Sequence, residues 1–408
     1  MTEVLIVGAG LTGLFASLLA AEHGDAVTLV AQGRGGLGLC HGCIDIWGRA
    51  TPSRALSRLR KSHPYRLAGK AALHAAVEFF NEITQQAKYP FSGSISRNLR
   101  LPTALGSIHS TALAPQSLAQ GDLDDATPFA LAGIDNLRDF YPQLAASNLR
   151  HTGIAVQSVL ELPIPLDGIR HDFSTSDLAQ LFDQPNWREE TARIWKPHLT
   201  GIKRLGLPAV LGLRDPQHVL EDMQERLGVT LFEIPTLPPS TPGLRLEVIL
   251  RRRALNTGVH LIEGPRAVGR IDGKSKGRRV SGVVLQTAGG PRIHTADVVI
   301  LATGGILNGG IVFQQNGSVQ ESVFDMPVNH DEGRHCWTTT SPIDSQPYSG
   351  YGILVNDHLQ PLDAKGAPIF DNLYAAGGLL GGADRTMEGS RQGIDLATAY
   401  RAVEVALG

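Results

Sequence analysis

The first residues with a chemical role are glycines close to the N-terminus. Residues 8–13 are Gly-Ala-Gly-Leu-Thr-Gly and match the G-x-G-x-x-G pattern of dinucleotide-binding proteins. An apolar strand pattern, Glu3–Val7, precedes them and an apolar helix pattern, Leu11–His23, follows, which is the context that this motif requires. We therefore expect a phosphate at the helix N-terminus. The expected contacts are Gly8, Gly10, Leu11, Thr12 and Gly13.

Two later segments indicate that the bound group is a flavin. Leu301–Gly305 and Leu373–Gly378 each begin in a predicted buried strand and end in glycines. Small residues after a strand let the chain pass beside a flat ring. A helix beginning near Gly393 would point its positive end at the flavin edge that becomes anionic on reduction. The expected flavin contacts in these segments are Thr303, Gly304, Gly377, Gly378, Gly393 and Ile394.

The end of the second predicted strand, Ala26–Val30, bears on which flavin is bound. Dinucleotide-binding domains usually place an acidic residue there, which binds the adenosine ribose. This chain has Ala31 and then Gln32, and an amide bonds a hydroxyl more weakly than a carboxylate does. We therefore expect FMN, with FAD as the alternative, and count Gln32 and Gly33 among the cofactor contacts.

A glycine-rich loop with two cysteines follows, with the sequence GRGGLGLCHGC over residues 33–43. We expect this loop to wrap around the flavin phosphate or ribityl chain and to contact it through Gly42. Cys40 and Cys43 form a C-x-x-C pair, which is one pattern of a redox disulfide. The pair lies in a glycine loop and not at a helix start, so the simpler interpretation is two small residues packed near the cofactor. A zinc site needs more ligands than this pair supplies.

Two polar clusters contain the candidate catalytic residues. His330, Arg334 and His335 lie in NHDEGRHC, and Arg385 and Glu388 lie in ADRTMEGSRQG. A flavin dehydrogenase that acts on an alcohol needs a base for the hydroxyl proton, usually histidine. A phosphorylated substrate also needs cations, for which arginine is best suited. The alternative for each of these residues is an ordinary solvated loop.

Composition limits the classes of function. The 408 residues carry a formal net charge of −2, which gives no electrostatic argument for nucleic acid or an anionic membrane surface. Three cysteines are too few for a disulfide framework or for an iron–sulfur cluster with four thiolates, and we expect no metal. We expect no secretion signal, and no apolar run approaches the roughly 20 residues of a membrane span. The expected location is the cytoplasm, with membrane contact only through a partner.

These motifs require a Rossmann-type α/β flavin-binding domain built from both ends of the chain. We expect it to comprise residues 1–45 and 243–408, with an inserted α+β domain over 46–242. The apolar runs predict further strands at Val298–Ala302, Tyr351–Val355 and Asn372–Ala376, and a last helix at Gly393–Leu407.

Over essentially its whole length the chain resembles the flavoprotein family formed by the B subunits of anaerobic glycerol-3-phosphate dehydrogenases. The N-terminal glycine motif and the missing ribose acid both fit that family. The most specific match is FEIPTLPPS, Phe232–Ser240, because this segment has no generic structural explanation. The other matching segments are Leu101–Gly106, Leu205–Leu213, Phe232–Leu246 and Asn372–Thr398.

The resemblance implies partners and a reaction. It implies a second flavoprotein, which is the A subunit of the complex, and an iron–sulfur protein, the C subunit, which docks the complex on the inner face of the cell membrane. It also implies oxidation of a small phosphorylated polyol, sn-glycerol 3-phosphate, to dihydroxyacetone phosphate, with electrons passing toward a quinone, and FMN in the B subunit. One departure is that the family tends to carry serines where Cys40 and Cys43 stand.

Three other functions are compatible with the same residues. The first is a stand-alone flavin-dependent dehydrogenase of another small alcohol or acid. The second is a non-catalytic subunit that only relays electrons or supports assembly. The third is a disulfide reductase that uses Cys40 and Cys43.

Overall fold

The computed structural model describes residues 1–49, 51–165, 173–271 and 278–408, which form two compact units. Unit 1 consists of Met1–Gly36, Ser53–Phe80 and Leu250–Gly408, and unit 2 consists of Leu37–Pro52 and Asn81–Ile249. The boundaries predicted from the sequence lie at residues 45/46 and 242/243. The main difference is the segment Ser53–Phe80, which belongs to unit 1 because its helix α3 (Pro64–Ala68) packs against the C-terminal helix α12 (Arg391–Leu407).

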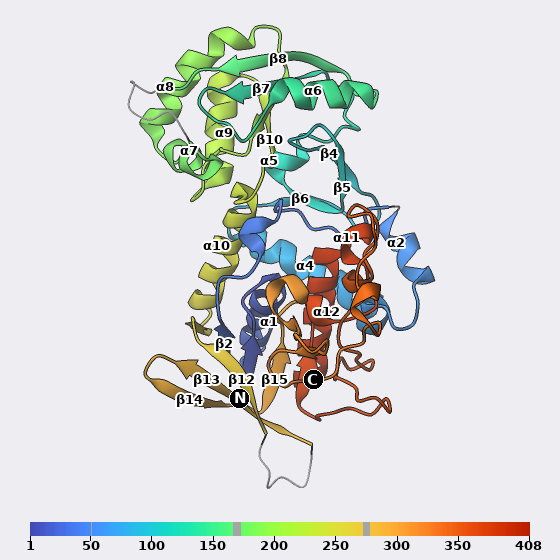
Figure 1. The fold of residues 1–408 in the computed structure, drawn as a ribbon. Helices are drawn as coiled ribbons and strands as arrows, with labels where there is room; N and C mark the ends of the chain where they lie inside the picture. The colour runs from blue at the N-terminus through green and yellow to red at the C-terminus, as the bar shows by residue number, and fades with distance from the viewer. Residues whose placement is uncertain (50, 166–172, 272–277) are drawn as a thin grey trace. The chain divides into compact units, whose positions relative to one another are not determined.

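Unit 1 is built on a parallel sheet with the strand order β11-β2-β1-β15-β18 (Figure 1). The side chains of the central strand β1 from Val4 to Val7 are buried, as expected for a parallel strand covered on both faces. The order brings the N-terminal strand between β2 and β15, so segments about 300 residues apart in the sequence are neighbours. The strands are β1 (Glu3–Val7), β2 (Ala26–Ala31), β11 (His260–Glu263), β15 (Val298–Leu301) and β18 (Leu373–Ala375).

The first and last helices of unit 1, α1 (Leu11–Glu22) and α12, pack against each other (Figure 1). Alanines are buried in both helices, and their small side chains allow a close approach. Three further helices contain residues of both units, and these are α2 (Pro52–Ala55), α4 (Lys70–Gln86) and α10 (Thr241–Asn256). The shorter helices and 3₁₀ turns of unit 1 are η2 (Leu56–Arg58), η4 (Ile306–Asn308), η5 (Arg334–Cys336), η6 (Pro347–Gly350), η7 (Gly377–Leu379) and α11 (Arg385–Glu388).

Antiparallel strands complete unit 1. They form the sheet β12-β13-β14 and the pair β16-β17, with bounds β12 (Arg266–Ile271), β13 (Val280–Thr287), β14 (Gly290–Thr295), β16 (Ile311–Phe313) and β17 (Val319–Glu321). The predicted strand at Tyr351–Val355 is wrong. Its residues make only isolated bridges, each to a different segment, with Asn329, Leu380 and Pro361 as the partners. Because the partners lie in three separate segments, these residues do not form a continuous ladder of backbone hydrogen bonds.

Unit 2 combines a parallel sheet, β10-β9-β7-β8, with the antiparallel pairs β3-β6 and β4-β5. The sequence predicts an α+β inserted domain. It does not predict that the main sheet of this unit is parallel. The strands are β3 (Phe91–Gly93), β4 (Leu99–Pro102), β5 (Ile108–Thr111), β6 (Leu113–Pro115), β7 (Phe129–Ile134), β8 (Val156–Leu162), β9 (Arg204–Pro208) and β10 (Thr230–Ile234). The helices and 3₁₀ turns are η1 (Leu37–Leu39), α5 (Gln116–Ala119), α6 (Pro142–His151), α7 (Thr175–Phe182), α8 (Pro185–Trp195), η3 (Lys196–Leu199) and α9 (Pro216–Leu227).

Both faces of the unit 2 sheet are covered. Along β7, Ala130 and Ala132 belong to one apolar core, which also contains Trp195. Phe129 and Leu131 belong to a second apolar core. This alternation follows from the two-residue period of a strand.

Among the described residues, no helix has the length and apolar character that a membrane span requires.

A buried ion pair in unit 2 explains the signature segment FEIPTLPPS. Glu233 and Arg245 have fully buried side chains, with Arg245 Nη1 2.5 Å from Glu233 Oε2 and Nη2 2.9 Å from Oε1. Glu233 Oε1 also accepts the N–H of Leu211 at 2.7 Å, and Arg245 Nε donates to the carbonyl of Gly212. The pair therefore joins two of the segments that carry the family resemblance.

We predict that Glu233→Gln strongly destabilises the protein. The substitution leaves the Arg245 charge buried without its counter-ion, which costs about 3–5 kcal/mol in comparable pairs. The matched control is Glu190→Gln, which removes an exposed pair with Arg193 and should change stability by less than about 1 kcal/mol. Chemical denaturation measures both values, and equal effects of the two substitutions would contradict this role for Glu233.

Candidate functional site

Glycines hold the backbone close together where β1 and β15 end. Gly8 has a φ of +114°, and a Cβ built on it would lie 2.2 Å from the carbonyl oxygen of Ala302. A Cβ at Gly13, in the first turn of α1, would lie 1.7 Å from the carbonyl oxygen of Gly8. Neither position has room for a side chain. This is the close packing of helix on strand that the first and third glycines of a dinucleotide motif allow.

Gly10 is different, because open space surrounds the position of its missing side chain. A Cβ there would meet nothing within 4 Å. No side chain caps α1 at Gly10, and the first intrahelical bond runs from the N–H of Leu14 to the carbonyl of Gly10 at 3.0 Å. The N–H groups of Leu11, Thr12 and Gly13 precede that bond. This combination of space and backbone donors fits a phosphate.

The two later glycine segments meet beside this turn. A Cβ at Gly305 would lie 2.8 Å from the carbonyl oxygen of Gly378, so the chain after β15 contacts the chain after β18. Thr303 and Gly304 lie at the start of the first segment, where Gly304 has a φ of +77°. The hydroxyl of Thr303 is buried and has no hydrogen-bond partner among the described residues. A buried polar atom without a partner fits a bound group that is not part of the chain.

A polar cluster lies directly on Gly377 and Gly378. Arg385 Nη1 donates to Asp395 Oδ1 at 3.0 Å. A Cβ at Gly377 would lie 2.2 Å from Thr12 Oγ1 and 2.9 Å from Asp395 Oδ1, and one at Gly378 would lie 2.2 Å from Arg385 Nη2. Burial raises the pKa of the Asp395 carboxyl, and the charge of Arg385 opposes that shift. Residues from both ends of the chain therefore surround the glycine pair.

Helix α12 begins two residues earlier than predicted, at Arg391, so Gly393 and Ile394 lie buried in its first turn. The first half of α12 lies next to the Gly377–Gly378 pair, because Asp395 Oδ1 would lie 2.9 Å from a Cβ at Gly377 and Thr398 Oγ1 accepts the N–H of Gly377 at 2.8 Å. The side-chain oxygen of Gln392 is buried there and has no hydrogen-bond partner among the described residues. Like the Thr303 hydroxyl, this atom fits a ligand outside the chain.

Glu388 makes contacts that sequence reasoning missed. Its Oε2 lies 3.3 Å from Nε2 of the buried His63 and accepts the hydroxyl of Ser390 at 2.8 Å. His63 Nδ1 accepts the N–H of Tyr65 at 3.2 Å, so the ring proton lies on Nε2 and is donated to Glu388. The contact joins residues 325 positions apart. The only local signal at His63 is the proline that follows it and starts α3.

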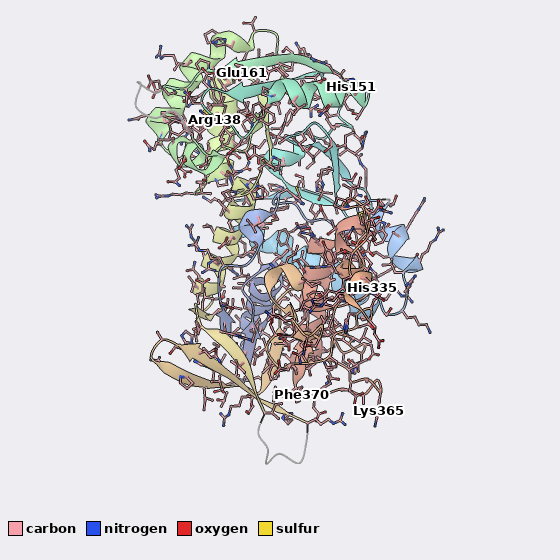
Figure 2. The ribbon with its side chains drawn as sticks, viewed as in Figure 1. Arg138, His151, Glu161, His335, Lys365 and Phe370 are labelled. Carbon is pink, nitrogen blue, oxygen red and sulfur yellow. The ribbon has the colours of Figure 1, made fainter. Side chains whose placement is uncertain are left out.

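The other predicted catalytic residues do not join this cluster. His330 Nδ1 lies 3.0 Å from the carbonyl oxygen of Val328. Arg334 and His335 are exposed on η5, where Figure 2 labels His335. Within the described ranges, no hydrogen bond or ion pair connects these three residues to Arg385 or Glu388. Their predicted catalytic role stays a prediction without structural support.

The region after β2 shows where a ribose acid is missing. Gln32 and Gly33 are exposed, and the next turn passes over Gly10, since a Cβ at Gly35 would lie 2.8 Å from the Cα of Gly10. Ala31 pairs in register with Glu263 on the adjacent parallel strand β11. Paired residues of parallel strands direct their side chains to the same face. A carboxylate therefore leaves the sheet beside the position where the motif usually has one.

The glycine loop with the cysteines continues into unit 2. Gly42 has a φ of +79° and packs on Pro242, and its expected contact with the cofactor stays a prediction. Cys40 and Cys43 are not joined by a disulfide. Cys43 is buried, and burial together with the charge of Asp45 raises the pKa of its thiol. A disulfide reductase needs an accessible thiolate with a lowered pKa, so this environment argues against that function.

Comparisons with known proteins agree with this geometry. Residues 3–394 match the family described as FAD binding domain. The probable B subunit of anaerobic glycerol-3-phosphate dehydrogenase from Halobacterium salinarum is 30% identical, over 98% of this chain and 96% of that protein. The corresponding B subunits from Actinobacillus pleuropneumoniae and Pectobacterium carotovorum are 29% and 30% identical, each over 98% of this chain and over 98% and 97% of their own lengths.

We predict that Gly10→Val removes bound flavin and leaves the fold intact. The valine side chain enters space that the protein leaves open, so it displaces only the ligand. The matched control is Gly289→Val in the exposed β13–β14 turn, where a Cβ is also tolerated. Flavin absorbance per chain and the melting temperature are the measurements. Full flavin content in Gly10→Val would contradict the assignment of this turn.

Proposed function

Because the chain belongs to the FAD binding domain family, and within it to the B subunits of anaerobic glycerol-3-phosphate dehydrogenase, we propose that it is the flavoprotein B subunit of such a complex. In this proposal it oxidises sn-glycerol 3-phosphate to dihydroxyacetone phosphate. The single observation that carries the proposal is the meeting of the first and last glycine segments at one sheet edge. It is supported by relatives that match the chain from end to end.

The chain's own residues suit the parts of a flavin. The N–H groups of Leu11 to Gly13 would hold a phosphate, and the glycine segment Gly377–Gly378 would pass beside the ring. The hydroxyl of Thr303 and the side-chain oxygen of Gln392 would form hydrogen bonds with the flavin, because neither atom has a partner among the described residues. A bound flavin supplies the acceptor for the hydride that leaves the alcohol carbon. The N-terminal end of α12 would stabilise negative charge at the ring edge.

The family description favours FAD and does not support the FMN that Ala31 predicts. We propose FAD, with Glu263 in place of the missing ribose acid. Its carboxylate leaves the sheet in register with Ala31 and is held by Arg251, whose Nη1 lies 2.9 Å from Glu263 Oε1. A carboxylate retains lone pairs for a ribose hydroxyl after accepting from one arginine.

For the substrate we propose that Glu388 receives the hydroxyl proton. Its Oε2 is held by the Nε2–H of His63 and the hydroxyl of Ser390, which fixes the carboxylate next to α12. Arg385, with its guanidinium on Gly378, supplies a cation for the substrate phosphate. The hydroxyl oxygen gives its proton to Glu388 while the carbon that carries this hydroxyl loses its hydrogen as a hydride, so the alcohol becomes a ketone.

The remaining steps rest on the resemblance to the family. We propose that electrons leave through a second flavoprotein and then through an iron–sulfur protein of the same complex toward a quinone. The iron–sulfur protein would hold the complex at the inner face of the membrane. The rival function is a subunit that only relays electrons, with the alcohol oxidised on a partner.

Anaerobic reduction of the bound flavin by substrate tests the proposal. We predict that sn-glycerol 3-phosphate bleaches the flavin of this chain and that its enantiomer, sn-glycerol 1-phosphate, does not. Glu388→Gln should keep the flavin and slow bleaching by about 10²–10⁴-fold, the usual contribution of a general base. Glu404→Gln, an exposed position on α12, should not change the rate. Bleaching only in the presence of a partner protein would favour the relay.

The identity of the cofactor is tested by acid release and chromatography. We predict FAD from the natural protein. Glu263→Gln should weaken FAD relative to FMN by about tenfold or more, because a charge-assisted bond contributes about 1.5–3 kcal/mol. Arg251→Gln breaks the ion pair but keeps the carboxylate, so it should retain the preference for FAD. Release of FMN alone from the natural protein would contradict the proposal of FAD and support the FMN that Ala31 predicts.

A further inference from the structure

A group of metal-ligand side chains lies in unit 2, outside the residues proposed for flavin and substrate. One nitrogen of each imidazole of His41 and His109 and the sulfur of Cys43 all lie within 4.8 Å of one another. The two rings are tilted, with their centroids 4.4 Å apart. Asp45 lies between them, with Oδ1 3.0 Å from His109 Nε2 and Oδ2 3.2 Å from His41 Nε2. Three ligand atoms, from His41, Cys43 and His109, thus lie close together, and the carboxylate of Asp45 contacts both imidazoles.

The backbone holds these residues in place. Ile44 pairs with Leu113, with the N–H of Ile44 2.8 Å from the carbonyl oxygen of Leu113. Thr111 Oγ1 donates to the carbonyl of Ile44 at 3.1 Å. His109 lies two positions before Thr111 on β5, so both side chains leave the same face of that strand. The loop that contains His41, Cys43 and Asp45 is therefore fixed to the strand that contains His109.

We propose that His41, Cys43, His109 and Asp45 bind one zinc ion. Two imidazoles, a thiolate and a carboxylate are ligands that zinc takes in its tetrahedral sites, whereas magnesium and calcium take oxygen ligands. One thiolate and one carboxylate also balance the charge of a divalent cation.

The distances suit this coordination. Tetrahedral ligands at zinc–nitrogen and zinc–oxygen distances of about 2.0–2.1 Å lie roughly 3.3 Å apart. His109 Nε2 lies 3.0 Å from Asp45 Oδ1 and His41 Nε2 lies 3.2 Å from Oδ2, so each imidazole is at about this spacing from one carboxylate oxygen. The Cys43 sulfur lies within 4.8 Å of one nitrogen of each imidazole and must move closer when an ion binds. His41 and His109 are about a third exposed, and this exposure gives an ion access to the buried Cys43.

The site resolves a question that the C-x-x-C pair leaves open. Of the two cysteines, only Cys43 is a proposed ligand. The other ligands are His41, which lies between the cysteines, Asp45, which follows them, and His109 on β5. A bound ion would cross-link the loop to the β4–β5 hairpin. The inference does not depend on the proposed dehydrogenase function, since none of the residues proposed for flavin or substrate is a ligand.

Metal content and titration with cobalt test the proposal. The full-length protein is freed of metal with a chelator and titrated with Co²⁺, followed by absorbance at wavelengths longer than the flavin bands. We expect one equivalent with the visible spectrum of a tetrahedral thiolate site, reversed by one equivalent of Zn²⁺. Protein purified without chelator should contain one zinc per chain by elemental analysis. Binding of less than one equivalent by the natural chain would overturn the proposal without any variant.

Variants locate the ion. Cys43→Ser and His109→Gln should each weaken metal binding by at least roughly 10–100-fold, the loss seen even when a second-shell partner is removed. The matched control is Cys336→Ser, which removes the cysteine of unit 1 and should bind the ion as the natural chain does. Flavin content and melting temperature confirm that each variant is folded. Natural affinity in both folded ligand variants would overturn the assignment.

Discussion

The closeness of the backbone at Gly8 and Gly13 is the constraint from which the flavin site follows. The space between the Gly8 carbonyl and α1 excludes even one carbon atom at Gly13, and Gly8 itself lies against the carbonyl of Ala302. This packing brings the N-terminus of α1 to the carboxyl edge of the sheet, between the ends of β2 and β15. The amide groups of the helix turn therefore lie beside the segments that follow β15 and β18. A larger residue at either glycine would move α1 away from that edge.

The C-terminal part of the chain completes this edge through small residues and charges. Gly377 leaves room for Thr12 and Asp395, and Gly378 leaves room for the guanidinium of Arg385. The contact of α12 with α1 brings these residues to the first glycine motif, although nearly the whole length of the chain separates them. The proposed site therefore takes residues from both ends of the chain. The match to the FAD binding domain family extends from residue 3 to residue 394 and so includes both groups of residues.

Local signals in the sequence predict the strands and glycine turns of unit 1 well. Glu3–Val7 is a strand with the predicted bounds, because an apolar run followed by glycines has few alternatives. Tyr351–Val355 has the same apolar character, but its partners are single residues of three separate segments, which no local pattern reveals. The pairing of His63 with Glu388 and of His109 with Asp45 could not be predicted for the same reason, since each contact depends on the tertiary fold. The role of Glu233 in the signature segment also depends on a contact that the local pattern does not show, its buried ion pair with Arg245 twelve residues later.

The most direct test of the account is amide hydrogen exchange of the flavin-free protein compared with the same protein loaded with flavin. If one flavin is held by both ends of the chain, loading should slow exchange at Gly10–Gly13, at Thr303–Gly305 and at Gly377–Ile394 together. The β13–β14 hairpin, which contains none of the proposed flavin contacts, should not change. Protection confined to the N-terminal turn, with the C-terminal segments unaffected, would contradict the central claim that both ends of the chain form one site.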